Sequence, residues 1–209
     1  MGRIDFVRAT PRLIAAAVLA AMGLLSAGDV WAQGGAALKA YSPQPTPDAL
    51  KPGLTVRYYT VKIRYMDELV RFVKSRPGTP GPVIAALDFA DKGPGANVMG
   101  TKQPELVGAV IDGLIRFDQP GRYELAMVVN DGVHLHIGDR LVIEKDWDGM
   151  PSLMGDSVWV AIEQPGWYQL HVKYFQRKGT AALELYWKKP GQAGEVELVP
   201  AEAFAHIPE

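Results

Sequence analysis

Short stretches in which every second residue is apolar fill most of the chain after residue 53, and glycine, proline, asparagine and aspartate separate them. Successive side chains of a β-strand point to opposite faces, so this alternation buries one face and leaves the other in water. The pattern predicts an all-β, antiparallel β-sandwich. Strands are predicted over residues 54–58, 109–117, 123–129, 133–137, 141–143, 158–162, 168–174 and 181–187.

Three turns between these strands predict how the strands connect. Gln119-Pro120-Gly121 follows one strand and Gln164-Pro165-Gly166 follows another, and each is succeeded by an alternating stretch that runs back. A third turn is predicted from Arg177 to Gly179. Because short turns commonly join neighbouring antiparallel strands, the sequence predicts a sandwich built from hairpins.

Two regions of the domain depart from alternation. Met66, Leu69, Val70 and Val73 recur at helical spacing, which predicts one short helix between Tyr65 and Lys74. Residues 78–100 are rich in glycine and proline, so they are expected to form a long excursion with at most a short strand.

The N-terminus has the pattern of a secretory signal peptide. Arginines in the first twelve residues precede an uninterrupted apolar run from Leu13 to Leu25, which is too short to span a bilayer. Ala32 is a small residue at the position that a signal peptidase reads, so we expect residues 1–32 to be removed before Gln33. Cleavage after Ala27 and an uncleaved anchor helix are the alternatives.

The rest of the chain is expected to hold a single domain with a short segment on each side. Residues 33–52 are rich in glycine, alanine and proline, which predicts a linker that does not pack. The sandwich is expected over residues 53–191, and residues 192–209 form a C-terminal extension that can add one edge strand. No second apolar stretch is long enough to predict a membrane span after cleavage.

Charge and composition exclude several kinds of function. The 22 basic and 23 acidic side chains nearly balance, so no nucleic-acid-binding surface is predicted. The absence of cysteine excludes thiol catalysis, cysteine zinc sites and disulfides. The chain has no nucleophile elbow, metalloprotease helix motif or phosphate loop, which favours a binding module over an enzyme. A pair of facing carboxylates that hydrolyses glycosides is the enzymatic alternative.

Several aromatic and glycine motifs occur in a distinctive order. They are Gly121-Arg-Tyr-Glu-Leu, Val129-Asn-Asp-Gly-Val-His-Leu-His-Ile-Gly-Asp-Arg-Leu-Val-Ile, Pro165-Gly-Trp-Tyr, Val172-Lys-Tyr-Phe and Leu183-Glu-Leu-Tyr-Trp. From Gly53 to about Gly191 the chain resembles the PA-fourteen domain family, named for the anthrax protective antigen. The resemblance implies a lectin-like β-sandwich of the kind found in adhesins, glycosidases and bacterial surface proteins, usually attributed to carbohydrate binding.

The resemblance also implies a ligand site. In sugar-binding adhesin members, two adjacent aspartates joined by a cis peptide hold a calcium ion that contacts sugar hydroxyls. Asn130-Asp131 matches this pair, so calcium is the implied cofactor, although asparagine removes one negative charge from the site. The alternative is that Asn130-Asp131-Gly132 only turns the chain. Trp147 and Asp148 lie in an acidic loop expected at the same end, where they would complete a ligand-binding set with residues 130–132. The alternative for Trp147 is a partly buried residue that anchors the sandwich.

A second possible site involves two histidines. His134 and His136 share a strand face opposite Val133, Leu135 and Ile137, so both rings are expected to point outward. A two-histidine metal site is geometrically possible, but no third ligand is assigned, and a solvated pair is the favoured interpretation.

These observations lead to one main functional expectation. The chain is expected to be an exported, non-enzymatic recognition domain, periplasmic or secreted, that binds a carbohydrate or another cell-envelope ligand. The alternatives are a structural module that docks onto an envelope protein and an accessory domain of a glycan-active enzyme.

Overall fold

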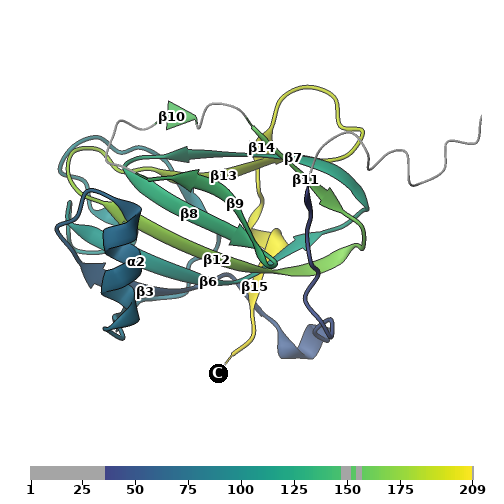
Figure 1. Ribbon diagram of the computed structural model, residues 1–209, viewed down its shortest axis with the longest axis horizontal. Helices are drawn as coiled ribbons and strands as arrows, with labels where there is room; N and C mark the ends of the chain where they lie inside the picture. The colour runs from purple at the N-terminus through teal and green to yellow at the C-terminus, as the bar shows by residue number, and fades with distance from the viewer. Residues whose placement is uncertain (1–35, 147–151, 154–156, 209) are drawn as a thin grey trace, which may run out of the picture. The chain divides into compact units, whose positions relative to one another are not determined.

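A computed structural model describes residues 36–146, 152–153 and 157–208 of the chain. The predicted signal peptide and two predicted site residues, Trp147 and Asp148, lie outside these ranges. The described residues belong to one compact unit, in which two β-sheets face each other (Figure 1). This arrangement confirms the predicted antiparallel β-sandwich.

The first sheet has the strand order β1-β11-β7-β13-β14. Its strands are β1 (Ala36–Ala37), β11 (Val158–Ile162), β7 (Gly121–Val129), β13 (Leu183–Lys188) and β14 (Glu197–Leu198). Two short strands, β5 (Asp88–Phe89) and β10 (Ser152–Leu153), pair with β13 and β7. These pairings are antiparallel except that of β1 with β11, which is parallel.

The second sheet has the strand order β2-β15-β6-β12-β8-β9. Its strands are β2 (Lys51–Pro52), β15 (Phe204–His206), β6 (Val107–Phe117), β12 (Gly166–Gln176), β8 (Gly132–Ile137) and β9 (Arg140–Lys145). Strand β3 (Thr55–Thr60) pairs with β6 and with β4 (Thr79–Pro80). Short 3-10 helices occupy Pro47–Ala49, Val98–Gly100 and Ala201–Ala203.

The predicted hairpins around all three turns are wrong. Strands β6 and β12 lie in the second sheet, whereas β7, β11 and β13 lie in the first, so each turn carries the chain across the sandwich. Glycines with positive φ, Gly121 at 136° and Gly166 at 142°, lie at the first two crossings. Alternation predicts which face of a strand is buried, but it does not identify the neighbouring strand. Strands β8 and β9 do form a hairpin.

An aromatic cluster closes the core beside the first two of these turns. Phe117 packs edge-on against Tyr123 and Tyr168, with ring centroids 4.8 and 5.3 Å apart, and Trp187 lies beside them. The Tyr123 and Tyr168 hydroxyls donate hydrogen bonds to turn carbonyls four residues earlier, at 3.3 and 2.7 Å. A buried hydroxyl needs such a partner, so these tyrosines fix the first two sheet crossings.

Helix α2 (Met66–Lys74) confirms the helical prediction, and it covers part of the outer face of the second sheet. Its buried side chains, Met66 and Leu69, join a small cluster with Phe175 of β12. Gly132 permits this packing, because an added Cβ would lie 2.2 Å from Phe175 Cε1 and 2.9 Å from Met66 Sδ. The helix therefore depends on a glycine at the start of β8.

The two segments that flank the predicted domain both pack on the sandwich. Leu38 of the proline-rich segment is only 6% exposed, and its N–H donates to the Ala161 carbonyl at 3.0 Å. This segment differs from the expected unpacked linker because its backbone extends the edge of the first sheet at β11. Val199 and Phe204 of the C-terminal extension are also buried. The 78–100 excursion contains two strands of two residues each, β4 and β5.

Candidate functional site

The Asn130-Asp131-Gly132 turn forms a buried corner where the chain passes from β7 to β8. Asn130 and Asp131 are each 3% exposed, and Asp131 has a positive φ of 55°. Asn130 Nδ2 donates to Thr180 Oγ1 at 3.1 Å, and Arg177 N–H donates to Asp131 Oδ2 at 2.6 Å. The corner therefore ties its own turn to the 177–180 turn, a structural role that sequence reasoning did not predict.

A buried lysine lies at the same corner. Lys145, the last residue of β9, is 8% exposed, and its Nζ donates to the Val129 carbonyl at 3.2 Å. Burial lowers the pKa of Lys145, and attraction to the Asp131 carboxylate opposes that lowering. The ammonium group and the carboxylate thus stabilise each other's charge in a place that excludes most water.

The described residues at this corner do not fit the calcium ion that the resemblance implies. Asn130 Oδ1 is buried without a hydrogen-bond partner among the described residues and could offer one oxygen. However, the part of the corner that the structure describes has one carboxylate, already bonded to Arg177 N–H, and the nearby ammonium of Lys145 repels a divalent cation. Within the described ranges the one cis peptide bond joins Ser42 and Pro43, so the Asn130–Asp131 bond is trans.

The cavity beside this corner is small. It has a volume of about 170 Å³ and is lined in part by Tyr174, Ala182 and Met99. Burial, followed by the Asp131 and Asp91 carboxylates, raises the pKa of Tyr174. Pockets for organic ligands usually have about 300–1,000 Å³, so this cavity is smaller than a usual ligand pocket.

A larger groove lies on the outer face of the second sheet, where sequence reasoning predicted no site. Its volume is about 550 Å³. Thr55 and Arg57 of β3, Asp112 of β6 and Gln169 of β12 contribute polar side chains to its floor.

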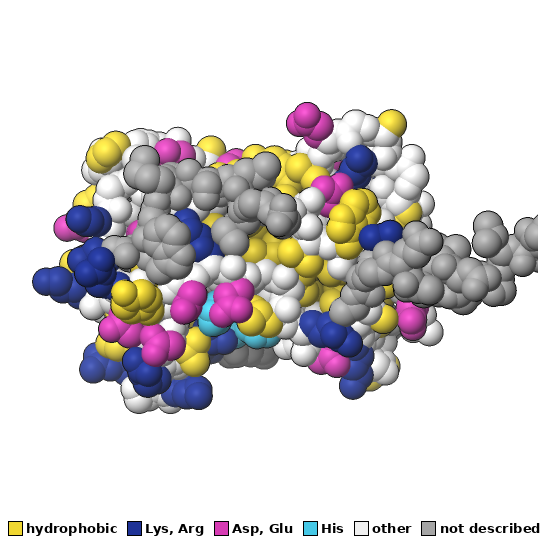
Figure 2. Space-filling model, turned by 45° about the horizontal axis from the view of Figure 1, so that its top comes forward, with side chains coloured by type: hydrophobic (Ala, Val, Ile, Leu, Met, Phe, Trp, Pro, Cys, Tyr) yellow, Lys and Arg dark blue, Asp and Glu magenta, His cyan; other side chains and the backbone are white. Residues whose placement is uncertain are grey.

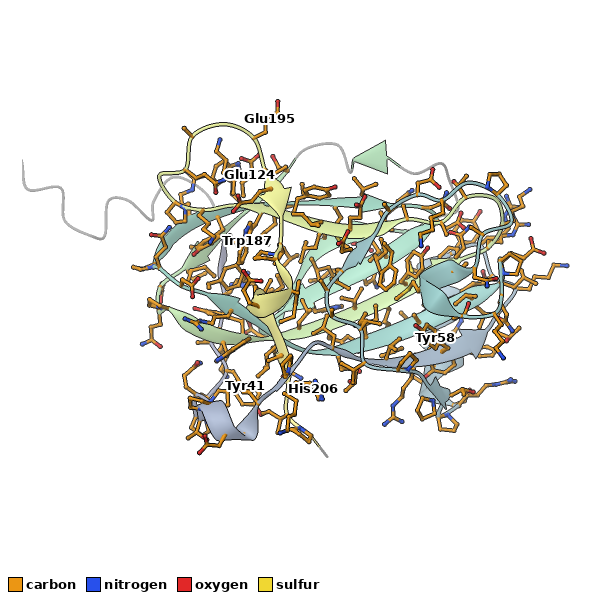
Figure 3. The ribbon with its side chains drawn as sticks, turned by 180° about the vertical axis from the view of Figure 1, so that it is seen from behind. Tyr41, Tyr58, Glu124, Trp187, Glu195 and His206 are labelled. Carbon is orange, nitrogen blue, oxygen red and sulfur yellow. The ribbon has the colours of Figure 1, made fainter. Side chains whose placement is uncertain are left out.

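Side chains from both ends of the domain form the rim of this groove. Tyr41 lies in the N-terminal segment and His206 in β15, and the two side chains lie near each other beneath the second sheet (Figure 3). His206 Nδ1 lies 3.0 Å from the Gly53 carbonyl, which fixes the ring at the groove. The groove therefore combines the aromatic ring of Tyr41 with the positively charged Arg57 and the negatively charged Asp112.

A row of histidines continues across the same face. Val133, Leu135 and Ile137 are fully buried, which confirms that His134 and His136 point away from the core. His171 of β12 extends the row, with ring centroids 5.9 Å from His136, and its Nδ1 lies 2.6 Å from Asp112 Oδ1. The rings are partly buried rather than solvated, and burial with the neighbouring Lys173 lowers the pKa of His136 to about 4.

Comparison with known protein families and solved structures shows what the chain is similar to. Residues 100–198 match the model of the PA14 domain family. Over just under half of its length, the chain is therefore similar to PA14 domains. No curated protein matches the chain at a significant level. In the ranges that the structure describes, no helix is long and apolar enough to cross a membrane.

Solved PA14 structures share this fold at low sequence identity. The PA14 sugar-binding domain from an RTX adhesin has a TM-score of 0.61 and 14% identity, over 74% of this chain and 98% of that domain. The PA14 domain of the MpAFP antifreeze protein has a TM-score of 0.62 and 14% identity, over 79% and 96%. The Candida glabrata epithelial adhesin 9 A domain, in complex with Galβ1-3GlcNAc, has a TM-score of 0.61 and 11% identity, over 83% and 97%.

Proposed function

We propose that this chain is a non-enzymatic recognition domain that binds carbohydrate outside the cytoplasm. Two of its structural neighbours are a sugar-binding adhesin domain and an adhesin domain in complex with a galactose-containing disaccharide. Because their sequence identity to this chain is low, these neighbours support only the class of ligand, a carbohydrate, and not a particular sugar or site. The groove on the second sheet is the feature of this molecule that carries the proposal.

The groove has the size and chemistry that sugar binding requires. Its volume of about 550 Å³ lies within the usual range for ligand pockets. Tyr41 offers a flat apolar face against which the C–H groups of a sugar ring can pack. Asp112 accepts hydrogen bonds, Arg57 donates them and Gln169 does both, which suits ligand hydroxyls.

The proposed binding does not depend on calcium at the Asn130-Asp131 corner. Both side chains are buried, and Lys145 supplies the positive charge that balances Asp131. The alternative location for the sugar is the set predicted from the sequence, residues 130–132 with Trp147 and Asp148, of which the last two lie outside the described residues. Substitutions in the groove and at Trp147 distinguish the two locations by which of them abolishes glycan binding.

Export is the second part of the proposal, and it rests on the charged start, the apolar run and the small residues before Gln33. A recognition domain for envelope or extracellular glycans must be outside the cytoplasm to meet its ligand. N-terminal sequencing of the exported protein should find Gln33 or a residue near it. Recovery of the intact Met1 start would contradict the proposal.

A glycan array tests the proposed function. The full chain should retain a defined set of glycan ligands in excess EDTA. Gln169→Ala and Tyr41→Ala should lose at least about tenfold in affinity, the loss expected when about 1.4 kcal/mol of contacts is removed. Gln103→Ala removes another exposed glutamine, outside the groove, and should bind as the parent does.

Two outcomes of the array would contradict this assignment. Binding that survives both groove variants but fails in Trp147→Ala would move the site to the set predicted from the sequence, residues 130–132 with Trp147 and Asp148. No glycan binding at all would favour a structural module that docks onto another envelope protein.

A further inference from the structure

The β8–β9 hairpin brings three metal-binding side chains together on the outer face of the second sheet. They are His134 of β8, Glu144 of β9 and Asp146, which follows β9. One ligand atom from each side chain lies within 4.8 Å of the other two. We propose that these residues form a binding site for a first-row divalent transition metal ion such as Zn²⁺.

The separations between the ligand atoms match a small metal ion. His134 Nε2 lies 3.3 Å from Glu144 Oε1 and 4.0 Å from Asp146 Oδ1. Zinc bonds of about 2.0–2.2 Å to nitrogen and oxygen place tetrahedral ligand atoms roughly 3.3–3.5 Å apart. The separation between His134 and Glu144 already fits this geometry. The Asp146 carboxylate must move toward His134 by less than about 1 Å to fit it as well. Glu144 and Asp146 are 52% and 55% exposed, so their carboxylates can move by this amount.

The His134 ring turns one nitrogen toward the two carboxylates. Its side chain is 14% exposed, and among the described residues its buried Nε2 has no hydrogen-bond partner. Glu144 Oε1, 3.3 Å away, forms an ion pair with this nitrogen only if the ring is protonated. A metal ion between a neutral imidazole and the carboxylates would bind this nitrogen directly and satisfy it.

The backbone holds the three residues in place before any ion binds. His134 and Glu144 are directly opposite each other in the β8–β9 register. The Asp146 carbonyl accepts a hydrogen bond from the Met66 N–H at 3.0 Å, which ties it to the start of α2. Figure 2 shows histidine side chains next to acidic ones on the visible face. The ligands thus come from rigid elements, which reduces the entropy lost on binding.

The donor set selects the kind of metal. One imidazole and two carboxylates suit zinc and neighbouring transition metals, whereas calcium and magnesium prefer oxygen ligands alone. The two carboxylates would balance the charge of a divalent ion. Three protein ligands leave a coordination position for water or for another molecule. This site shares no residue with the sugar groove or the Asn130-Asp131 corner, so it stands independently of the proposed function.

Titration of the full chain, without a polyhistidine tag, tests the inference. Calorimetry with Zn²⁺ should show one ion per chain with micromolar affinity, and Co²⁺ should develop visible absorption bands from the same site. His134→Ala and Glu144→Gln should each weaken zinc binding by at least about tenfold. Removing a residue that only hydrogen-bonds to a metal ligand already costs about 10–100-fold in affinity, and removing a ligand itself should cost at least as much. Millimolar Ca²⁺ should not compete.

The matched control is His171→Ala, which removes a histidine of the same row that is not among the proposed ligands. It should retain the parent's zinc affinity. Failure of the parent to bind zinc would overturn the inference, as would unchanged binding in both Glu144→Gln and His134→Ala. Loss of binding in His171→Ala but not in Glu144→Gln would place the ion at another site and also overturn it. Because Glu144 is exposed, its variant should fold even if His134→Ala does not.

Discussion

Replacing Lys145 tests whether a lysine provides the positive charge at the Asn130-Asp131 corner. Lys145→Met keeps most of the length of the side chain but removes the ammonium that donates to the Val129 carbonyl. Asp131, only 3% exposed, then retains its bond from Arg177 N–H but loses the neighbouring cation. The negative charge of Asp131 would then lie in a place of low water content without the nearby Lys145 ammonium.

Burial decides the size of the expected effect. A pair of exposed charges contributes about 0–1 kcal/mol, whereas removing one partner of a buried pair costs about 3–5 kcal/mol. Because Lys145 is 8% exposed, we expect the variant to lose about 3 kcal/mol of unfolding free energy. For a domain of this size, that loss lowers Tm by about 6–12 °C.

A double-mutant cycle measured by chemical denaturation gives the control. Lys145→Met combined with Asp131→Asn removes both charges, so the double variant should recover most of the stability that Lys145→Met loses. Millimolar calcium should leave the Tm of the parent unchanged. The reasoning fails if Lys145→Met is as stable as the parent, or if calcium stabilises the parent.

Three further predictions concern the packing of the domain. Gly132→Ala should lose about 1–3 kcal/mol in denaturant unfolding through overpacking against Phe175, and an unchanged midpoint would contradict the packing of α2 on β8. Leu38→Ala should cost about 2–4 kcal/mol in the same assay because Leu38 is in the core, whereas an unpacked linker would show no change. Burial raises the pKa of Tyr174 above its usual 10, so the stability from this group is complete below about pH 10 and is lost as pH rises further. Absorbance titration should show it ionising together with alkaline unfolding, and ionisation at pH 10 in the folded protein would refute its burial.

Alternation along the chain was sufficient to predict the longer strands and the faces they bury, but not two-residue strands such as β1 and β10. Tyr123, Leu125 and Met127, predicted on one face, are all fully buried. The pairing of strands could not be predicted in this way, because a turn such as 119–121 can join strands within a sheet or across the sandwich. The difference depends on long-range contacts, including the Phe117 cluster, that have no local signal in the sequence.

The candidate sites were less accessible to sequence reasoning. The groove is assembled from Tyr41, Arg57, Asp112, Gln169 and His206, which are far apart in the chain and meet only because β3, β6, β12 and β15 share one sheet. A scattered set of ordinary polar residues gives no motif.

Lys145 did carry a signal that the sequence analysis missed. It follows Ile143 by two residues and therefore continues the inward face of the strand. A lysine at an inward position requires a buried partner, and Asp131 was already a candidate site residue. The two ligands that accompany His134 in the proposed metal site, Glu144 and Asp146, were also missed, since Glu144 is opposite His134 only in the register of the folded hairpin.

The most direct test of the central claim is a crystal structure of the chain with a glycan selected on the array, grown in the presence of EDTA. The account predicts a sugar ring in the groove of the second sheet, against Tyr41 and within hydrogen-bond distance of Asp112 or Gln169. A sugar bound beside Asn130 and Asp131 with an empty groove would contradict it.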